Sequence, residues 1–253
     1  AEFERRLTQP SHGPTVVEEI DIRGINLADR ALRDWTFRRV AMEQASFQGA
    51  RLGRLHLAEC GLRGATLNQS HLQGCTLFHV EAMESSFRGS DLQDVQFNDC
   101  RLSNVDFSSA RLVGTTFMAC EMFGSRWESS FLSQVSFDAE ERGNVTLDRA
   151  DFSGSVLMNV DLMGANLFGA CFDNAILVGV DLRRANLAGA RFNGAHFIDV
   201  MWTDDSLEPG LQRAMSAAND GELAARSERL QALLAAREQQ DLTRLTEVLL
   251  LGD

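Results

Sequence analysis

Residues 150–192 read ADFSGSVLMNVDLMGANLFGACFDNAILVGVDLRRANLAGARF, and every fifth residue from Phe152 onward is a leucine or a phenylalanine. The same spacing extends in both directions, from Ile22 to Trp202, without a slip. Of the 37 positions in this series, only Ala82 and Arg142 are not Leu, Ile, Phe, Met or Trp. A fixed short period over most of a chain indicates a repeat architecture.

A second position of the repeat is also constrained. The residue two places before each large one is small or β-branched in most repeats, as at Cys100, Val105 and Ala165. A period of five fits neither an amphipathic helix nor an alternating strand, whose periods are about 3.6 and 2. Two inward side chains followed by a turn fit a chain that bends every five residues around a narrow axis. Stacked turns then bury one another's apolar sides.

The units ANLFG (165–169), ANLAG (185–189) and ADFSG (150–154) resemble the A(D/N)LXX consensus of the pentapeptide-repeat family. The resemblance covers roughly residues 20–207. It implies an all-β solenoid, a right-handed quadrilateral β-helix with four pentapeptides per coil and about nine coils over this stretch. At ~4.8 Å per strand spacing, the rod would be roughly 40 Å long. Proline is absent between Pro14 and Pro209, as expected where backbone amides pair from coil to coil.

The domain organisation predicted from these patterns has three parts. Residues 1–19 form an N-terminal lead-in that is partly disordered or capping, and Val16 and Val17 either begin the first coil or cap its end. Residues 20–206 form the β-helix, and residues 207–253 form a C-terminal helical module. Around Arg142, we expect residues 139–144 to bulge outward or turn locally, in register and without a long inserted loop, because a buried unpaired arginine is costly.

The helical module is predicted from the change of pattern after Pro209 and Gly210, where Ala, Leu, Glu, Gln and Arg dominate. Its leucines recur at spacings that fit the apolar stripe of a helix. The module could cap the open last coil, whose edge is prone to pairing. It could also pair with a second copy, since in dimeric family members a C-terminal helical module joins the copies, or it could dock another protein. The stripe consists of Leu223, Leu230, Leu234, Leu242, Leu245 and Leu249.

Composition favours a cytoplasmic protein. The sequence contains no run of 18 apolar residues, which would indicate a membrane span. The start, AEFERRLTQP, lacks the apolar region of a signal peptide and lacks an initiator methionine, so the chain could be a fragment of a larger protein. A secreted effector or a secretion-system accessory stays open. Cysteines at the small inward position are interpreted as buried hydrophobic residues, with a disulfide or metal site as the alternative. Cys100 and Cys120 should stack in adjacent coils.

Charge decides against direct nucleic-acid binding. All 24 basic residues are arginine, and the chain carries a net charge of −12. The repeat region holds 24 acids against 17 arginines, so it lacks the clustered cations that neutralise phosphates. When residues 20 apart are assigned to one face, one face carries an acidic column that is a candidate partner-binding site. Its alternative interpretation is an ordinary solvated face with its own arginine pairs. The column consists of Glu81, Glu121, Glu141, Asp161 and Asp181.

The same counting predicts an apolar patch on the neighbouring face. Soluble monomers rarely leave such a surface bare, so we expect it to be covered by the chain's own helices, by a second copy or by a partner. The candidate docking or dimer face consists of Met118, Val156, Met158, Ile176, Val178 and Ile198.

The motifs of catalysis are missing from the sequence, which predicts a protein that is not an enzyme and needs no cofactor or metal. The five histidines are scattered, and no GxSxG or HExxH motif occurs. Two functions remain. The first is a protein-interaction scaffold, acting alone or as a module or accessory of a larger bacterial assembly. The alternative is a DNA mimic that binds DNA gyrase or topoisomerase IV, as in family members that confer resistance to quinolones or topoisomerase poisons.

Overall fold

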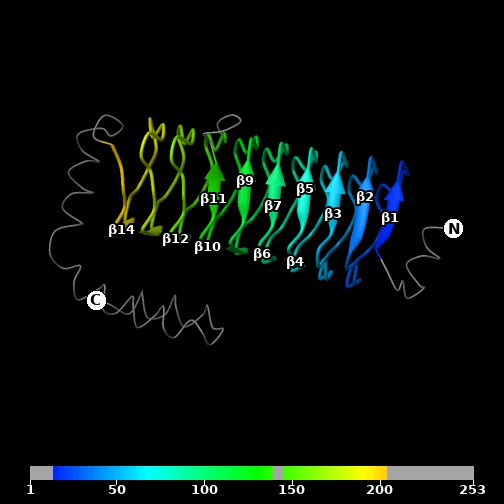
Figure 1. Cartoon of the computed structure of the whole chain (residues 1–253). Helices are drawn as coiled ribbons and strands as arrows, with labels where there is room; N and C mark the ends of the chain where they lie inside the picture. The colour runs from blue at the N-terminus through cyan, green and yellow to red at the C-terminus, as the bar shows by residue number, and fades with distance from the viewer. Residues whose placement is uncertain (1–13, 139–144, 204–253) are drawn as a thin grey trace.

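The computed structural model describes residues 14–138 and 145–203. Over these residues the chain winds into a parallel β-solenoid of about nine coils. The coils stack along one axis, with β1 at one end of the rod and β14 at the other (Figure 1). The predicted all-β solenoid is confirmed.

Two faces of the solenoid carry seven-stranded parallel sheets. Each strand has only three or four residues and pairs with the strand one coil further on. The sheets therefore extend along the rod, through many short strands. The first sheet runs β1 (Thr15–Glu18), β2 (Trp35–Arg38), β3 (His56–Ala58), β5 (Thr76–Phe78), β7 (Gln96–Asn98), β9 (Thr116–Met118) and β11 (Ser136–Asp138). The second runs β4 (His71–Gln73), β6 (Asp91–Gln93), β8 (Arg111–Val113), β10 (Phe131–Ser133), β12 (Val156–Met158), β13 (Ile176–Val178) and β14 (His196–Ile198).

On the other two faces, successive coils are joined by single parallel bridges rather than by paired strands. One runs from Asp21 to Asn186 and is called the Asp21 face; the other runs from Asn26 to Arg191 and is called the Asn26 face. The faces that hold the two sheets are called the β1 face and the β4 face. Within each coil the chain visits the β1, Asp21, Asn26 and β4 faces in that order. The Asp21 face is therefore opposite the β4 face, and the β1 face is opposite the Asn26 face.

The core consists of the two inward side chains of each repeat. Residues at the large position are buried through the middle of the rod, and Ala82, one of the two exceptions to the pattern, is buried as well. Rings from opposite faces meet edge-on, as Phe97 and Phe107 do at 6.1 Å between centroids. Rings of the Asn26 face stack at 4.4 to 5.5 Å in one column, made of Phe87, Phe107, Trp127, Phe152, Phe172 and Phe192.

Backbone hydrogen bonds run from coil to coil along the whole rod. The Phe107 amide donates to the Arg126 carbonyl at 2.7 Å, and the Arg126 amide donates to the Val105 carbonyl at 2.9 Å. The corner residue of each repeat adopts a positive φ, often at glycine but also at residues such as Arg184 (φ 61°). This left-handed corner turns the chain by one face while it leaves the amides on either side free to pair.

A unit of five extra residues interrupts the 20-residue coil. Arg101 bridges to Glu121, 20 residues on, but Glu121 bridges to Thr146, 25 residues on. The other three faces cross the same coil with a spacing of 25 as well, as for Arg126 and Asp151, and from Thr146 onward the spacing is 20 again, as for Thr146 and Asn166. The face assignment of every residue after this point, if made by counting in steps of 20, is therefore wrong by one face. Residues 139–144 themselves lie outside the described residues.

At the N-terminal end, β1 pairs in parallel with β2, so the first coil includes Val17, which is buried, while Val16 is exposed. The predicted helical module of residues 207–253 lies outside the described residues, and with it the leucines of its stripe. Within residues 14–138 and 145–203, no helix is long and apolar enough to cross a membrane.

Candidate interaction surfaces

The predicted acidic column is wrong, because its members lie on two different faces. Glu81 and Glu121 lie on the Asp21 face with Arg101 between them. Arg101 Nη1 is 3.4 Å from Glu81 Oε1, and its Nε is 3.9 Å from Glu121 Oε2. Glu141 lies outside the described residues. Beyond Glu121 the column continues with the neutral residues Thr146, Asn166 and Asn186.

The two aspartates of the predicted column lie on the β1 face, where Asp161 bridges to Ser136 and to Asp181. Both carboxylates hold local turns: Asp161 Oδ1 accepts the Met163 amide at 2.9 Å, and Asp181 Oδ2 lies 2.6 Å from Arg183 Nη2. The hydrogen bond from the Arg183 side chain lowers the pKa of Asp181. These aspartates are therefore neutralised or used locally, and they form no extended acidic surface.

The predicted apolar face is partly wrong for the same reason. Met118 belongs to β9 on the β1 face, apart from the other members. The other five residues do share one face, the β4 face, since Val156 pairs with Ile176 and Met158 pairs with Val178, which pairs with Ile198. Sequence counting missed Phe131, which points outward beneath Val156 on the same face.

Two exposed phenylalanines stand on the Asp21 face. Phe123 and Phe168 are 44% and 47% exposed, and they occupy the same outward position two coils apart. At ~4.8 Å per coil, this places them about 10 Å apart along the rod. The Arg149 guanidinium lies 5.9 Å from the Phe123 ring centroid, and Asp148 Oδ1 accepts a hydrogen bond from Asn166 Nδ2 at 2.8 Å. The wall between the rings is thus polar and ordered.

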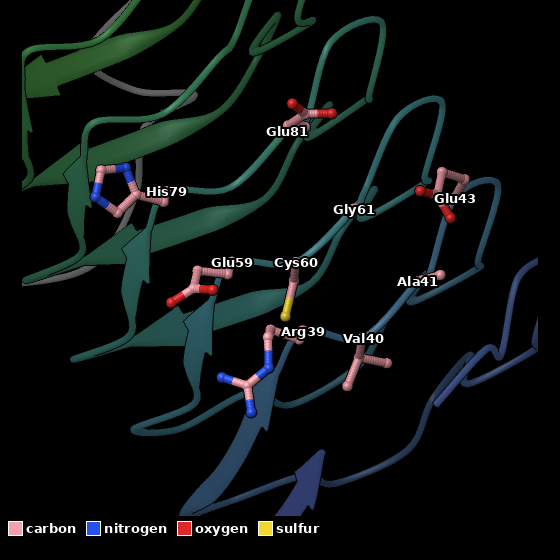
Figure 2. Close-up of a pocket in the computed structure, with 9 residues that line it drawn as sticks. All are labelled: Arg39, Val40, Ala41, Glu43, Glu59, Cys60, Gly61, His79 and Glu81. Carbon is pink, nitrogen blue, oxygen red and sulfur yellow. The ribbon is translucent and has the colours of Figure 1, made fainter. Parts of the chain in front are cut away.

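A shallow hollow of about 420 Å³ lies at the corner between the β1 and Asp21 faces (Figure 2). Glu43, Glu59 and Glu81 line it together with the basic side chains of Arg39 and His79. Arg39 is already paired with Glu19 at 2.7 Å, outside the hollow. The Glu43 carboxylate lies against Gly61, where an added Cβ would be 2.1 Å from Glu43 Oε1. The hollow is open and of mixed charge.

The structure confirms that the cysteines at the small inward position, Cys60, Cys75, Cys100 and Cys120, are small buried residues. All five cysteines are buried and free. Cys100 and Cys120 lie in adjacent coils, as predicted, since the residues after them, Arg101 and Glu121, form a bridge. Burial raises the pKa of the Cys75 thiol to about 11. The Cys75 thiol therefore stays protonated at neutral pH, and a protonated thiol is a poor nucleophile and a poor metal ligand.

Among residues 14–138 and 145–203, Asp106 on the Asn26 face is the most buried carboxylate, with 4% of its surface exposed. Its Oδ2 lies 3.1 Å from Arg126 Nη2 and 3.4 Å from Arg88 Nη1, and its Oδ1 accepts the Ser108 amide at 2.9 Å. Burial by itself would raise the pKa of this carboxyl. The hydrogen bonding by Ser108 and the charges of Arg126 and Arg88 outweigh burial, so the pKa lies below its ordinary value of 3.8.

We expect Asp106→Asn to lower the free energy of unfolding at pH 7 by about 1–3 kcal/mol, the usual loss when a buried charged hydrogen bond is broken. Because the folded-state pKa is lowered, the aspartate stabilises the fold fully above pH ~4 and loses this effect as the pH falls through the folded pKa. Urea denaturation at pH 7 and at acidic pH measures the difference. The control is Asp151→Asn, two coils further along, where the half-buried carboxylate accepts the Ser153 amide. A difference between wild type and Asp106→Asn that stays constant with pH would contradict the assignment.

Comparison with known proteins identifies the repeats. A family model described as "Pentapeptide repeat region" matches residues 50–127 and 90–167, and one described as "Pentapeptide repeats (8 copies)" matches residues 175–200. Together the matches cover more than half of the chain. No curated protein matches the chain significantly in sequence.

The similar solved structures include proteins with different biological roles. Full-length QnrB1, a plasmid-mediated fluoroquinolone resistance protein, is 13% identical with a TM-score of 0.43, over 80% of this chain and 98% of QnrB1. HetL, a pentapeptide repeat protein involved in heterocyst differentiation regulation in the cyanobacterium Nostoc, is 20% identical with a TM-score of 0.30, over 79% of this chain and 92% of HetL.

Proposed function

The chain belongs to the pentapeptide repeat family, and from that premise we propose that it is a non-enzymatic scaffold that binds a protein partner through its Asp21 face. The observation that carries this proposal is the pair of exposed rings, Phe123 and Phe168, on one rigid wall. Aromatic side chains are enriched among the residues that dominate binding energy at protein interfaces. A solenoid wall loses little conformational entropy on binding, because it is already ordered.

The surroundings of the two rings suit a protein rather than a nucleic acid. Arg149 lies beside Phe123, Asp148 lies between the two coils that carry the rings, and Asn166 adds amide groups. Interfaces of this kind combine apolar anchors with a polar rim. Along the described part of the Asp21 face, the bridge positions after Arg101 are Glu121, Thr146, Asn166 and Asn186, which offer no run of arginines to neutralise successive phosphates.

The alternative function, a DNA-mimicking binder of DNA gyrase or topoisomerase IV, would use the acidic column as its electrostatic surface. Arg101 interrupts that column, and its two aspartates lie on another face. Electrostatic mimicry needs a strong field over an extended surface. The arrangement of charges therefore favours the scaffold, while the predicted homodimer through residues 207–253 stays a prediction.

Site-specific cross-linking tests the proposal. We expect a photoreactive phenylalanine at position 123, and separately at position 168, to capture the same protein in cells of the source organism. The matched control places the same residue at Gln73, an exposed outward position on the opposite β4 face, which should not capture that protein. Capture of nothing from positions 123 and 168, or equal capture from Gln73, would overturn the assignment of the Asp21 face. Gyrase or topoisomerase IV as the captured protein would favour the alternative.

A further inference from the structure

The last four coils of the β4 face carry an apolar patch, here called the terminal patch. It is formed by residues that point away from the core, in strands β10, β12, β13 and β14 that pair in parallel and in register. The strands stack Val156 over Ile176 and Met158 over Val178 and Ile198. The terminal patch consists of Phe131, Ser133, Val156, Met158, Ile176, Val178 and Ile198.

Four of these outward side chains are buried even though they lie on the outside of the wall. Exposed fractions are 1% for Ser133, 3% for Met158, 6% for Phe131 and 9% for Ile198. The equivalent positions in earlier coils of the same face, such as Gln73 and Gln93, are exposed. Neighbouring coils lie beside an outward side chain rather than over it, and the other three faces point elsewhere. The burial therefore requires a cover on the outside of the wall.

We propose that the chain's own C-terminal residues 204–253 pack over the terminal patch. Residue 203 lies one corner after β14, at the start of the β1 face, so the segment begins next to the patch. Four coils at ~4.8 Å make a patch roughly 20 Å long. A helix of about 13 residues spans this length at 1.5 Å per residue. The segment is 50 residues long and carries an apolar stripe from Leu223 to Leu234 and another from Leu242 to Leu249.

This contact assigns the β4 face to the chain itself and leaves the opposite Asp21 face to a partner. The two proposals are independent, because a cover on one wall neither needs nor blocks a partner on the opposite wall. A cover over the terminal patch would also protect the end of the rod. Phe192 and Trp202, near the end of the described rod, are only partly buried, whereas rings in its middle such as Phe107 are fully buried.

Photo-cross-linking in the full chain tests the contact. A diazirine amino acid of about methionine size replaces Met158, with the same replacement at Met118 on the β1 face as the matched control. A mixture of ¹⁵N-labelled and unlabelled protein separates contacts within one chain from contacts between copies. We expect position 158, and not position 118, to cross-link to peptides of residues 204–253 of the same chain. Cross-links between labelled and unlabelled copies would show that a second copy covers the patch. The absence of any cross-link would show that the patch is open. Either result would overturn the proposal.

Limited proteolysis of a charge variant gives a second readout. Met158→Glu should expose residues 204–253 and speed tryptic cleavage after Arg226, Arg229 and Arg237 at least about tenfold, because cleavage follows the population of the open form. Met118→Glu should leave this cleavage rate unchanged. Circular dichroism establishes that the rod of each variant is intact. Fast cleavage already in the wild type, or an unchanged rate in a folded Met158→Glu variant, would contradict the cover.

Discussion

Replacement of Phe107 with aspartate is expected to unfold the middle of the rod. The ring is fully buried, stacks on Phe87 at 4.9 Å and on Trp127 at 4.4 Å, and meets Phe97 and Phe117 edge-on. Removal of a buried phenylalanine to alanine typically costs about 3–5 kcal/mol. An unpaired charge in the same site costs more. Since small proteins are stable by about 5–15 kcal/mol, the loss is a large part of the total.

The position of Phe107 explains why its effect should spread. In a solenoid each coil is buried only by its neighbours, so loss of one core position weakens the interfaces on both sides. Chemical denaturation followed by circular dichroism measures the effect. The matched control is Phe123→Asp, because Phe123 is 44% exposed on the outside of the wall and its replacement should be nearly neutral. Leu167→Asp, at a fully buried position of the second half, should behave like Phe107→Asp. A soluble and cooperatively unfolding Phe107→Asp variant would refute the inward assignment.

Replacement of Gln96 with proline is expected to cause the second large loss, through the backbone alone. The Gln96 side chain is exposed, but its amide donates to the Cys75 carbonyl at 2.9 Å, in the middle of the first sheet. Proline has no amide hydrogen, so the Cys75 carbonyl would lose its partner inside the wall. An unsatisfied buried carbonyl costs about 1–3 kcal/mol, and the proline ring adds a steric cost within the sheet.

The change is measured as the shift of the denaturation midpoint relative to Gln96→Ala, which removes the same side chain and keeps the amide. Gln96→Ala should differ from the wild type by a few tenths of a kcal/mol at most, as surface substitutions usually do. If the proline variant were as stable as the alanine variant, coil-to-coil hydrogen bonds at this position would not contribute to the stability of the rod.

The side chains that point into the core could be predicted from the sequence, because the interior of the rod requires the same kind of residue in every repeat. Each repeat needs a large residue at the same position to fill the core along the axis. The spacing of residues such as Phe107 and Leu167 therefore predicts that they are buried. Cys100 and Cys120 were assigned to adjacent coils by the same logic. Even Ala82, which breaks the pattern, stays in the core because its position, rather than its size, decides its direction.

The outward half could be predicted only up to the extra unit between Glu121 and Thr146. An insertion of five residues preserves a period of five, so the sequence pattern runs through it without a visible break. Arg142 at a large position was the signal of this unit, but the residues around it, although expected to bulge or turn, were counted as one regular repeat. As a result, Asp161 was placed with Glu81, and Met118 was placed with Val156, although each pair lies on two different faces.

The extra five residues between Glu121 and Thr146 lengthen one coil without adding a face to it. All four faces cross this coil with a spacing of 25 residues, as Arg126 and Asp151 do on the Asn26 face. Phe168 follows Phe123 by 45 residues, which is one regular coil of 20 residues and the one coil of 25. Built into the wall as an ordinary repeat, the five residues would have placed Phe168 on the Asn26 face, a right angle away from Phe123. The alignment of the two rings therefore does not depend on the extra residues, whereas gain or loss of one repeat within the wall would turn every later outer column by one face.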